Sequence, residues 1–135
     1  MQSKQILVIF SLFLLSGCVA ATPYQPMGFR GGYSDSQLQN DKFQVSFSGN
    51  MKLTQAKARQ YALRRAAEVT LNNGFDYFMV EENQDISHAF VSGNDGDIIG
   101  GSKPEAILNI HCGKGKKPEN TQGAYDAQEL LQYAK

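Results

Sequence analysis

The apolar and polar positions of this chain become periodic beyond its first 41 residues. Residues 42–48 alternate between apolar and polar side chains, which predicts a β-strand whose buried face contains Phe43, Val45 and Phe47. Apolar residues then recur with a helical period between Thr54, a suitable N-cap, and Gly74, a typical C-terminal stop. We therefore predict a strand followed by a helix over about residues 54–73.

The apolar face of the helix predicted for residues 54–73 consists mostly of alanine. This face is formed by Ala58, Ala62, Leu63, Ala66 and Val69, and the opposite, polar face by Lys57, Gln60, Arg64 and Glu68. Because alanine side chains are short, the helix axis can approach a β-sheet closely. We expect the helix to pack on one face of a sheet.

Two more strands are predicted in the second half of the chain. The first covers about residues 75–82, where β-forming residues are concentrated. Residues 83–104 are rich in glycine and predict a long loop or an irregular hairpin, in which Ile98-Ile99 can add a short strand. The next strand covers residues 106–112. Its two faces contain Ala106, Leu108, Ile110 and Cys112, and Ile107, Asn109 and His111.

A short helix is predicted at the end of the chain. Asp126 is its N-cap, and Glu129 completes a capping box. Its apolar face is formed by Ala127, Leu130, Leu131 and Ala134. The predicted fold class is α+β, a small twisted β-sheet in β-α-β-β-α order with the one long helix packed on a face.

The first residues of the chain have the features of a bacterial lipoprotein signal. Lys4 precedes an apolar run over residues 6–15 that is too short to cross a bilayer as a helix. The run ends in Leu-Ser-Gly17-Cys18, which resembles a lipobox. In such a signal the cysteine sulfur takes a diacylglyceryl group, the peptide bond between Gly17 and Cys18 is cut, and the new amino terminus is acylated.

The lipobox sets the expected organisation of the chain. We expect a lipoprotein signal peptide over residues 1–17, a lipid-anchored tether over residues 18–41 and a single α+β domain over residues 42–135. Prolines and glycines with little periodicity favour the tether. Its aromatic residues either fold back onto the domain or lie at the lipid interface; they are Tyr24, Phe29 and Tyr33.

The expected location is the cell envelope. Val19 follows the cysteine, where an aspartate would retain an enterobacterial lipoprotein in the inner membrane, so we expect the periplasmic face of the outer membrane. The chain has 13 basic and 13 acidic residues, and this balance argues against nucleic-acid binding. Once Cys18 is acylated, Cys112 is the only other cysteine, so no intramolecular disulfide can form.

Candidate catalytic residues are few. Cys112 follows His111, but adjacent residues of a strand point to opposite faces, so the thiol and the imidazole cannot meet. Cys112 shares its register with Leu108 and Ile110 and is expected to be a core residue. No nucleophile elbow, phosphate-binding loop or pair of carboxylates is present, so the chain is not expected to be an enzyme or to hold a cofactor.

The candidate metal ligands have unfavourable spacing. His88, His111 and Cys112 match no zinc motif, and residues 94–97 resemble part of a calcium loop but lack its glutamate. A tight turn explains residues 94–97 better, and no metal is expected. Three lysines after the last strand either contact anionic headgroups or lie on a solvated turn, which is the favoured interpretation; they are Lys114, Lys116 and Lys117.

Several runs of this chain resemble one family. They lie at residues 22–26 (TPYQP), 31–34 (GGYS), 43–50 (FQVSFSGN) and 61–68 (YALRRAAE). These runs are similar to a group of small, uncharacterised proteobacterial lipoproteins, and the similarity extends over about residues 15–82. The resemblance implies a lipoprotein with a single domain and brings no catalytic residues.

Two functions of different classes are compatible with these features. The first is a non-enzymatic envelope lipoprotein that holds a partner near the membrane, whether protein, peptidoglycan or lipid. The second is a small-ligand-binding or catalytic module that uses residues 83–104 with His88. Apolar residues in that segment favour the first function; they are Phe90, Val91, Ile98 and Ile99.

Overall fold

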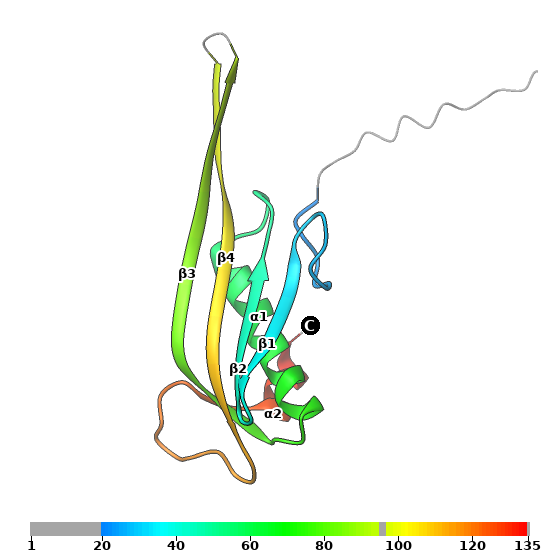
Figure 1. Cartoon of the computed structure of the whole chain (residues 1–135), viewed down its shortest axis with the longest axis vertical. Helices are drawn as coiled ribbons and strands as arrows, with labels where there is room; N and C mark the ends of the chain where they lie inside the picture. The colour runs from blue at the N-terminus through cyan, green and yellow to red at the C-terminus, as the bar shows by residue number, and fades with distance from the viewer. Residues whose placement is uncertain (1–19, 95–96, 135) are drawn as a thin grey trace, which may run out of the picture.

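The domain consists of an antiparallel β-sheet with helices packed on it (Figure 1). The computed structural model describes residues 20–94 and 97–134, and the side chains only outside residues 90–100. In chain order the elements are β1 (Gly32–Gln39), β2 (Lys42–Ser48), α1 (Gln55–Asn72), β3 (Tyr77–Asn94), β4 (Asp97–Gly113), β5 (Ala124–Asp126) and α2 (Ala127–Tyr133). The strand order is β1-β2-β4-β3-β5. The predicted α+β class with one long helix on a small sheet is confirmed.

Helix α1 connects two parallel strands that are not neighbours. β2 and β3 are each antiparallel to β4, which lies between them, so they run in the same direction. The connection from β2 through α1 to β3 is the crossover that the sequence predicts. The predicted strands and helices are present in the predicted order, and the structure adds β1 and β5 at the two edges of the sheet.

The core lies between α1 and the sheet, as the apolar pattern predicts. Thr54 caps the helix, with its hydroxyl oxygen accepting a hydrogen bond from the Lys57 N–H at 3.1 Å, and Gly74 has a φ of +82°. Leu63 of the predicted apolar face is only partly buried. The buried apolar residues of α1 and of the three central strands are Ala58, Ala62, Ala66, Ala67, Val69, Phe43, Val45, Phe47, Phe78, Ala106, Leu108, Ile110 and Cys112.

The tether predicted for residues 18–41 is wrong over its described part. Residues 32–39 form β1, which pairs with β2 in a register that places Tyr33 opposite Phe47. Thr22 is 1 % exposed. The domain therefore includes residues from at least Thr22, and not only those from residue 42. The pattern missed β1 because this edge strand exposes almost all of its side chains and shows no apolar alternation.

The loop predicted for residues 83–104 is also wrong, and the hairpin alternative is correct. β3 continues to Asn94 and pairs with β4 from Asp97 onward, so the strand predicted at residues 106–112 is the last part of β4. β2 pairs with β4 only as far as Glu105, and β5 contacts only the first residues of β3. Residues 87–94 and 97–104 therefore project past the other strands as a two-stranded arm, hereafter the hairpin arm (Figure 1).

The C-terminal helix begins where the sequence predicts. The Asp126 carboxylate accepts a hydrogen bond from the Glu129 N–H at 2.8 Å and caps α2. Ala127 is fully buried, and its N–H donates to the Asp76 carbonyl oxygen at 3.0 Å. Leu130 and Leu131 are partly buried against the core. These contacts fix α2 beside α1.

Candidate functional site

Residues 20–31 are fixed to one end of the sheet, hereafter the anchor end, by hydrogen bonds around Thr22. The Thr22 hydroxyl accepts from the Asn50 N–H and donates to the Arg30 carbonyl oxygen, both at 2.8 Å. The Asn50 side-chain amide donates to the Ala20 carbonyl oxygen at 2.8 Å, and the Arg30 guanidinium lies 3.4 Å from the same oxygen. The backbone is therefore held as far as Ala20, which is two residues after Cys18.

A turn at Gly31 brings this segment against β2. Gly31 has a φ of +98°, and a side chain there would collide with the carbonyl oxygen of Ser48. The Met27 N–H donates to the Tyr33 carbonyl oxygen at 2.8 Å, so residues 25–27 run beside the start of β1. Glycine at position 31 thus lets the segment lie directly on the end of the sheet.

Tyr24 fixes the same segment to α1. Its hydroxyl donates to the Glu68 carboxylate at 2.6 Å, and its ring lies 5.5 Å from the Tyr61 ring between centroids. The Arg64 guanidinium lies 3.9 Å from the centre of the Tyr24 ring, a cation–π geometry. Burial, with the added effect of the bond to Glu68, raises the pKa of Tyr24 far above its usual value, so the hydroxyl stays protonated and donates.

A second set of contacts continues this cluster along β1. The Arg65 guanidinium lies 4.3 Å from the centre of the Tyr33 ring and pairs with Asp35 at 2.7 Å and Glu68 at 3.2 Å. Arg64 and Glu68 were predicted on a solvated face of the helix, and in the structure they contact the N-terminal segment instead. Residues 22–26, 31–34 and 61–68 therefore meet in this cluster.

Removing the Tyr24 hydroxyl should weaken this attachment. Tyr24→Phe leaves the partly buried Glu68 carboxylate without its 2.6 Å donor. We expect the free energy of unfolding in urea to fall by about 1–2 kcal/mol. Tyr33→Phe is the matched control, because the Tyr33 hydroxyl makes no hydrogen bond among the described residues, and it should change stability little. Equal losses in the two variants would contradict this account.

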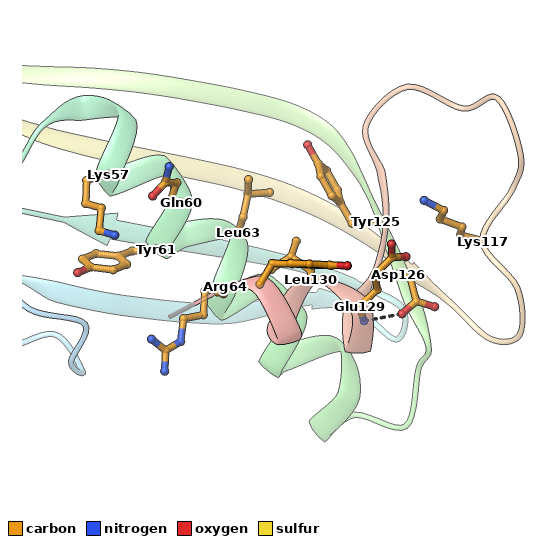
Figure 2. A pocket seen from close by; sticks show the side chains of 12 residues that line it. Lys57, Gln60, Tyr61, Leu63, Arg64, Lys117, Tyr125, Asp126, Glu129 and Leu130 are labelled. Atoms are coloured by element: carbon orange, nitrogen blue, oxygen red, sulfur yellow. Dashed lines mark hydrogen bonds between the residues drawn. The ribbon is translucent and has the colours of Figure 1, made fainter.

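A groove of about 450 Å³ lies between α1 and α2 (Figure 2). Leu63 of α1 and Leu130 of α2 lie in its middle, and Lys57 and Lys117 lie near its opposite ends. Its lining contains no cysteine, serine or histidine, and the Asp126 carboxylate is engaged in capping α2. The groove offers apolar contacts with charged ends but no pair of a nucleophile and a base.

Cys112 is a buried residue of β4, as predicted. It is 4 % exposed, and its sulfur lies 3.4 Å from the Thr70 hydroxyl oxygen. Burial raises the pKa of the Cys112 thiol, which opposes formation of the nucleophilic thiolate. His111 lies on the other face of the sheet, 2.7 Å from the Asp41 carboxylate, and this hydrogen bond lowers the pKa of Asp41. The predicted separation of thiol and imidazole is confirmed.

The candidate zinc ligands do not converge. His88 is opposite Lys103 in the hairpin arm, whereas His111 is opposite Met79. Nine positions of β3 separate these two levels, a distance of roughly 30 Å. His88 is instead 2.6 Å from the Glu105 carboxylate. In the part of the chain that the structure describes, no three His, Cys, Asp or Glu residues are placed to hold a metal ion.

The predicted turn at residues 94–97 and the three lysines after β4 are the remaining candidate sites. Of residues 94–97, which resemble part of a calcium loop, the middle two lie outside the described residues. The three lysines at positions 114, 116 and 117 lie on the turn after β4, at the end of the sheet opposite the anchor end (Figure 1). They are therefore far from the place where the chain leaves the domain toward Cys18.

The predicted lipidation and cleavage residues, Cys18 and Gly17, lie outside the described residues. Comparisons with protein-family models, curated proteins and solved structures found no match to this chain. Neither described helix is long and apolar enough to cross a membrane.

Proposed function

We propose that the chain is a lipoprotein that Cys18 anchors to the periplasmic face of the outer membrane, and that its domain binds a partner protein there without catalysis. The lipobox and the residue after it support the anchor and the location. The attachment of the chain as far as Ala20 implies that the domain lies directly at the membrane rather than at the end of a flexible tether. Two or three buried acyl chains would make this attachment effectively permanent.

The observation that carries the partner-binding function is the hairpin arm. Beyond Glu105, β4 has no β2 neighbour apart from the Gly49 N–H, which donates to the Pro104 carbonyl oxygen at 2.9 Å. Beyond Val80, β3 has no β5 neighbour, so among the described residues no strand lies beside most of either outer edge of the arm. An unpaired strand edge presents N–H and C=O groups that an extended segment of another protein can pair with. A long free edge of this kind favours a protein partner over peptidoglycan or lipid.

The arm also lies on the membrane side of the domain. Ser48 of β2 is opposite both Gly32 of β1 and Glu105 of β4, so the arm begins at the level of the anchor end. The arm continues for eight more residues of β4, a reach of roughly 25 Å. An ion pair between Arg59 of α1 and Asp85 fixes its base. The arm is therefore suited to reach a partner that is itself at the membrane.

Two observations favour binding over catalysis or a small-ligand site at residues 83–104. Cys112 and His111 lie on opposite faces of the sheet. His88 is paired with Glu105 on an exposed surface, and it does not line the groove between α1 and α2. Both arrangements are explained by ordinary packing and surface pairing.

Replacing Cys18 tests the anchor. In cells that produce the full chain, Cys18→Ser should abolish labelling by fatty acid and leave an uncut precursor. Cys112→Ala is the matched control, because it removes the other cysteine, which is buried in the domain, and it should keep the label. Continued labelling and processing of the Cys18→Ser variant at the same place would overturn the proposed anchor.

A further inference from the structure

Large apolar side chains are exposed to solvent at the anchor end. Phe29 is fully exposed, and Met27 and Met51 are about half exposed. They come from two turns, at residues 27–30 and 49–52, that the hydrogen bonds between Thr22, Arg30 and Asn50 hold together. A fully exposed phenylalanine on a tightly fixed turn contributes nothing to the core, so its position needs another reason.

The charge around these side chains has one sign. Arg30 and Lys52 are exposed beside Phe29 and Met51, and neither residues 20–33 nor residues 49–54 contain an aspartate or a glutamate. The chain as a whole is neutral, so these two turns carry a local excess of positive charge. Aromatic and apolar side chains flanked by basic residues suit the interface of an anionic bilayer.

The short link between Cys18 and Ala20 indicates that this surface contacts a bilayer. A link of two residues between Cys18 and Ala20 spans at most about 7 Å even when fully extended. Ala20 is bonded to Asn50 and Arg30, so these residues cannot move far from an acylated Cys18. A protein partner would have to enter the space between the lipid and a domain that is already at its surface.

We propose that the exposed side chains of the anchor end, Met27, Phe29 and Met51 with Arg30 and Lys52, form a surface that contacts the lipid headgroups and the outer part of the acyl chains. This inference rests on the proposed anchor at Cys18. Residues 27–30 lie beside β1 and residues 49–52 follow β2, whereas the hairpin arm extends past this end of the sheet from β3 and β4 (Figure 1). The sheet therefore lies obliquely on the bilayer, with the β1 side in contact and the arm beside the membrane surface. The bilayer thus fixes the orientation of the domain as well as its location.

The absence of tryptophan from the chain allows a direct test. The full-length lipidated protein with Phe29→Trp is reconstituted into vesicles of phosphatidylethanolamine and phosphatidylglycerol, and its fluorescence is measured with lipids brominated on the acyl chains. We expect a blue-shifted emission and several-fold stronger quenching than for Thr121→Trp. Thr121 is the control because it is exposed in the connection between Gly113 of β4 and Ala124 of β5, which lies at the opposite end of the sheet.

The outcomes separate this inference from the anchor. If the protein sediments with the vesicles but the two tryptophans are quenched equally, the anchor stands and the lipid-contacting surface is overturned. If the lipidated protein does not sediment with the vesicles, both proposals fail. Met51→Trp is a second reporter on the other turn, and an unquenched Met51→Trp beside a quenched Phe29→Trp would also overturn the surface as defined.

Discussion

Replacing Phe47 by alanine should lower the free energy of unfolding by about 3–5 kcal/mol, the usual cost of removing a buried phenylalanine. Phe47 is fully buried near the end of β2, and its ring lies 4.8 Å from Tyr61 of α1 and 6.3 Å from Tyr24 between centroids. It therefore joins the sheet, the helix and the N-terminal segment. A domain of this size has about 5–15 kcal/mol of stability in total, so the variant should be close to unfolding.

The matched control for Phe47→Ala is Phe29→Ala. Phe29 undergoes the same chemical change but is fully exposed, and its replacement should change stability by less than about 0.5 kcal/mol. Unfolding in urea followed by far-UV circular dichroism measures both effects. A small loss for Phe47→Ala, or losses of similar size in the two variants, would contradict the packing described for the core.

The sequence predicted those elements that have one buried and one solvated face. β2 and the last part of β4 alternate between apolar and polar residues because their inner faces cover the core, which contains Val45 and Leu108. β1 and the hairpin arm have no such alternation because most of their described side chains are exposed, and α1 contacts β1 through Arg65 rather than through an apolar face. Strand pairing, and not burial, holds these segments in place, and pairing partners leave little trace in a single sequence.

The attachment of the N-terminal segment could be predicted only in part. Its aromatic residues suggested that it folds back onto the domain, and Tyr24 and Tyr33 do so whereas Phe29 does not. The partners of Tyr24 could not be predicted, because Glu68 lies 44 residues away on a helix face that looks solvated from its polarity alone. Arginine and glutamate on a solvated helix surface can pair with each other, so their presence there does not indicate that a tyrosine packs on them.

Shortening the hairpin arm should abolish partner binding and leave the domain folded. Deletion of residues 90–101, with Ala89 joined to Ser102 through an Asn-Gly turn, removes the outer arm at a position where these two residues are opposite each other. Every buried apolar core residue of the described chain lies outside the arm, so the midpoint of thermal unfolding should change little. The free strand edges, which we propose to pair with the partner, lose most of their length.

Crosslinking in cells measures the effect of this deletion. A photoreactive residue at Ser87, which is exposed and is retained in both chains, should form an adduct with a membrane-associated protein in the full-length chain and not in the shortened one. The same residue at Thr121, on the turn at the opposite end of the sheet, should form no such adduct in either chain. If the shortened chain crosslinks as well as the full-length chain, the arm is not the binding surface. If the shortened chain unfolds, the arm stabilises the core, which contradicts the small change in the midpoint of unfolding expected here. A folded domain that has lost its adduct would assign partner binding to the outer arm, which contains none of the buried apolar core residues of the described chain.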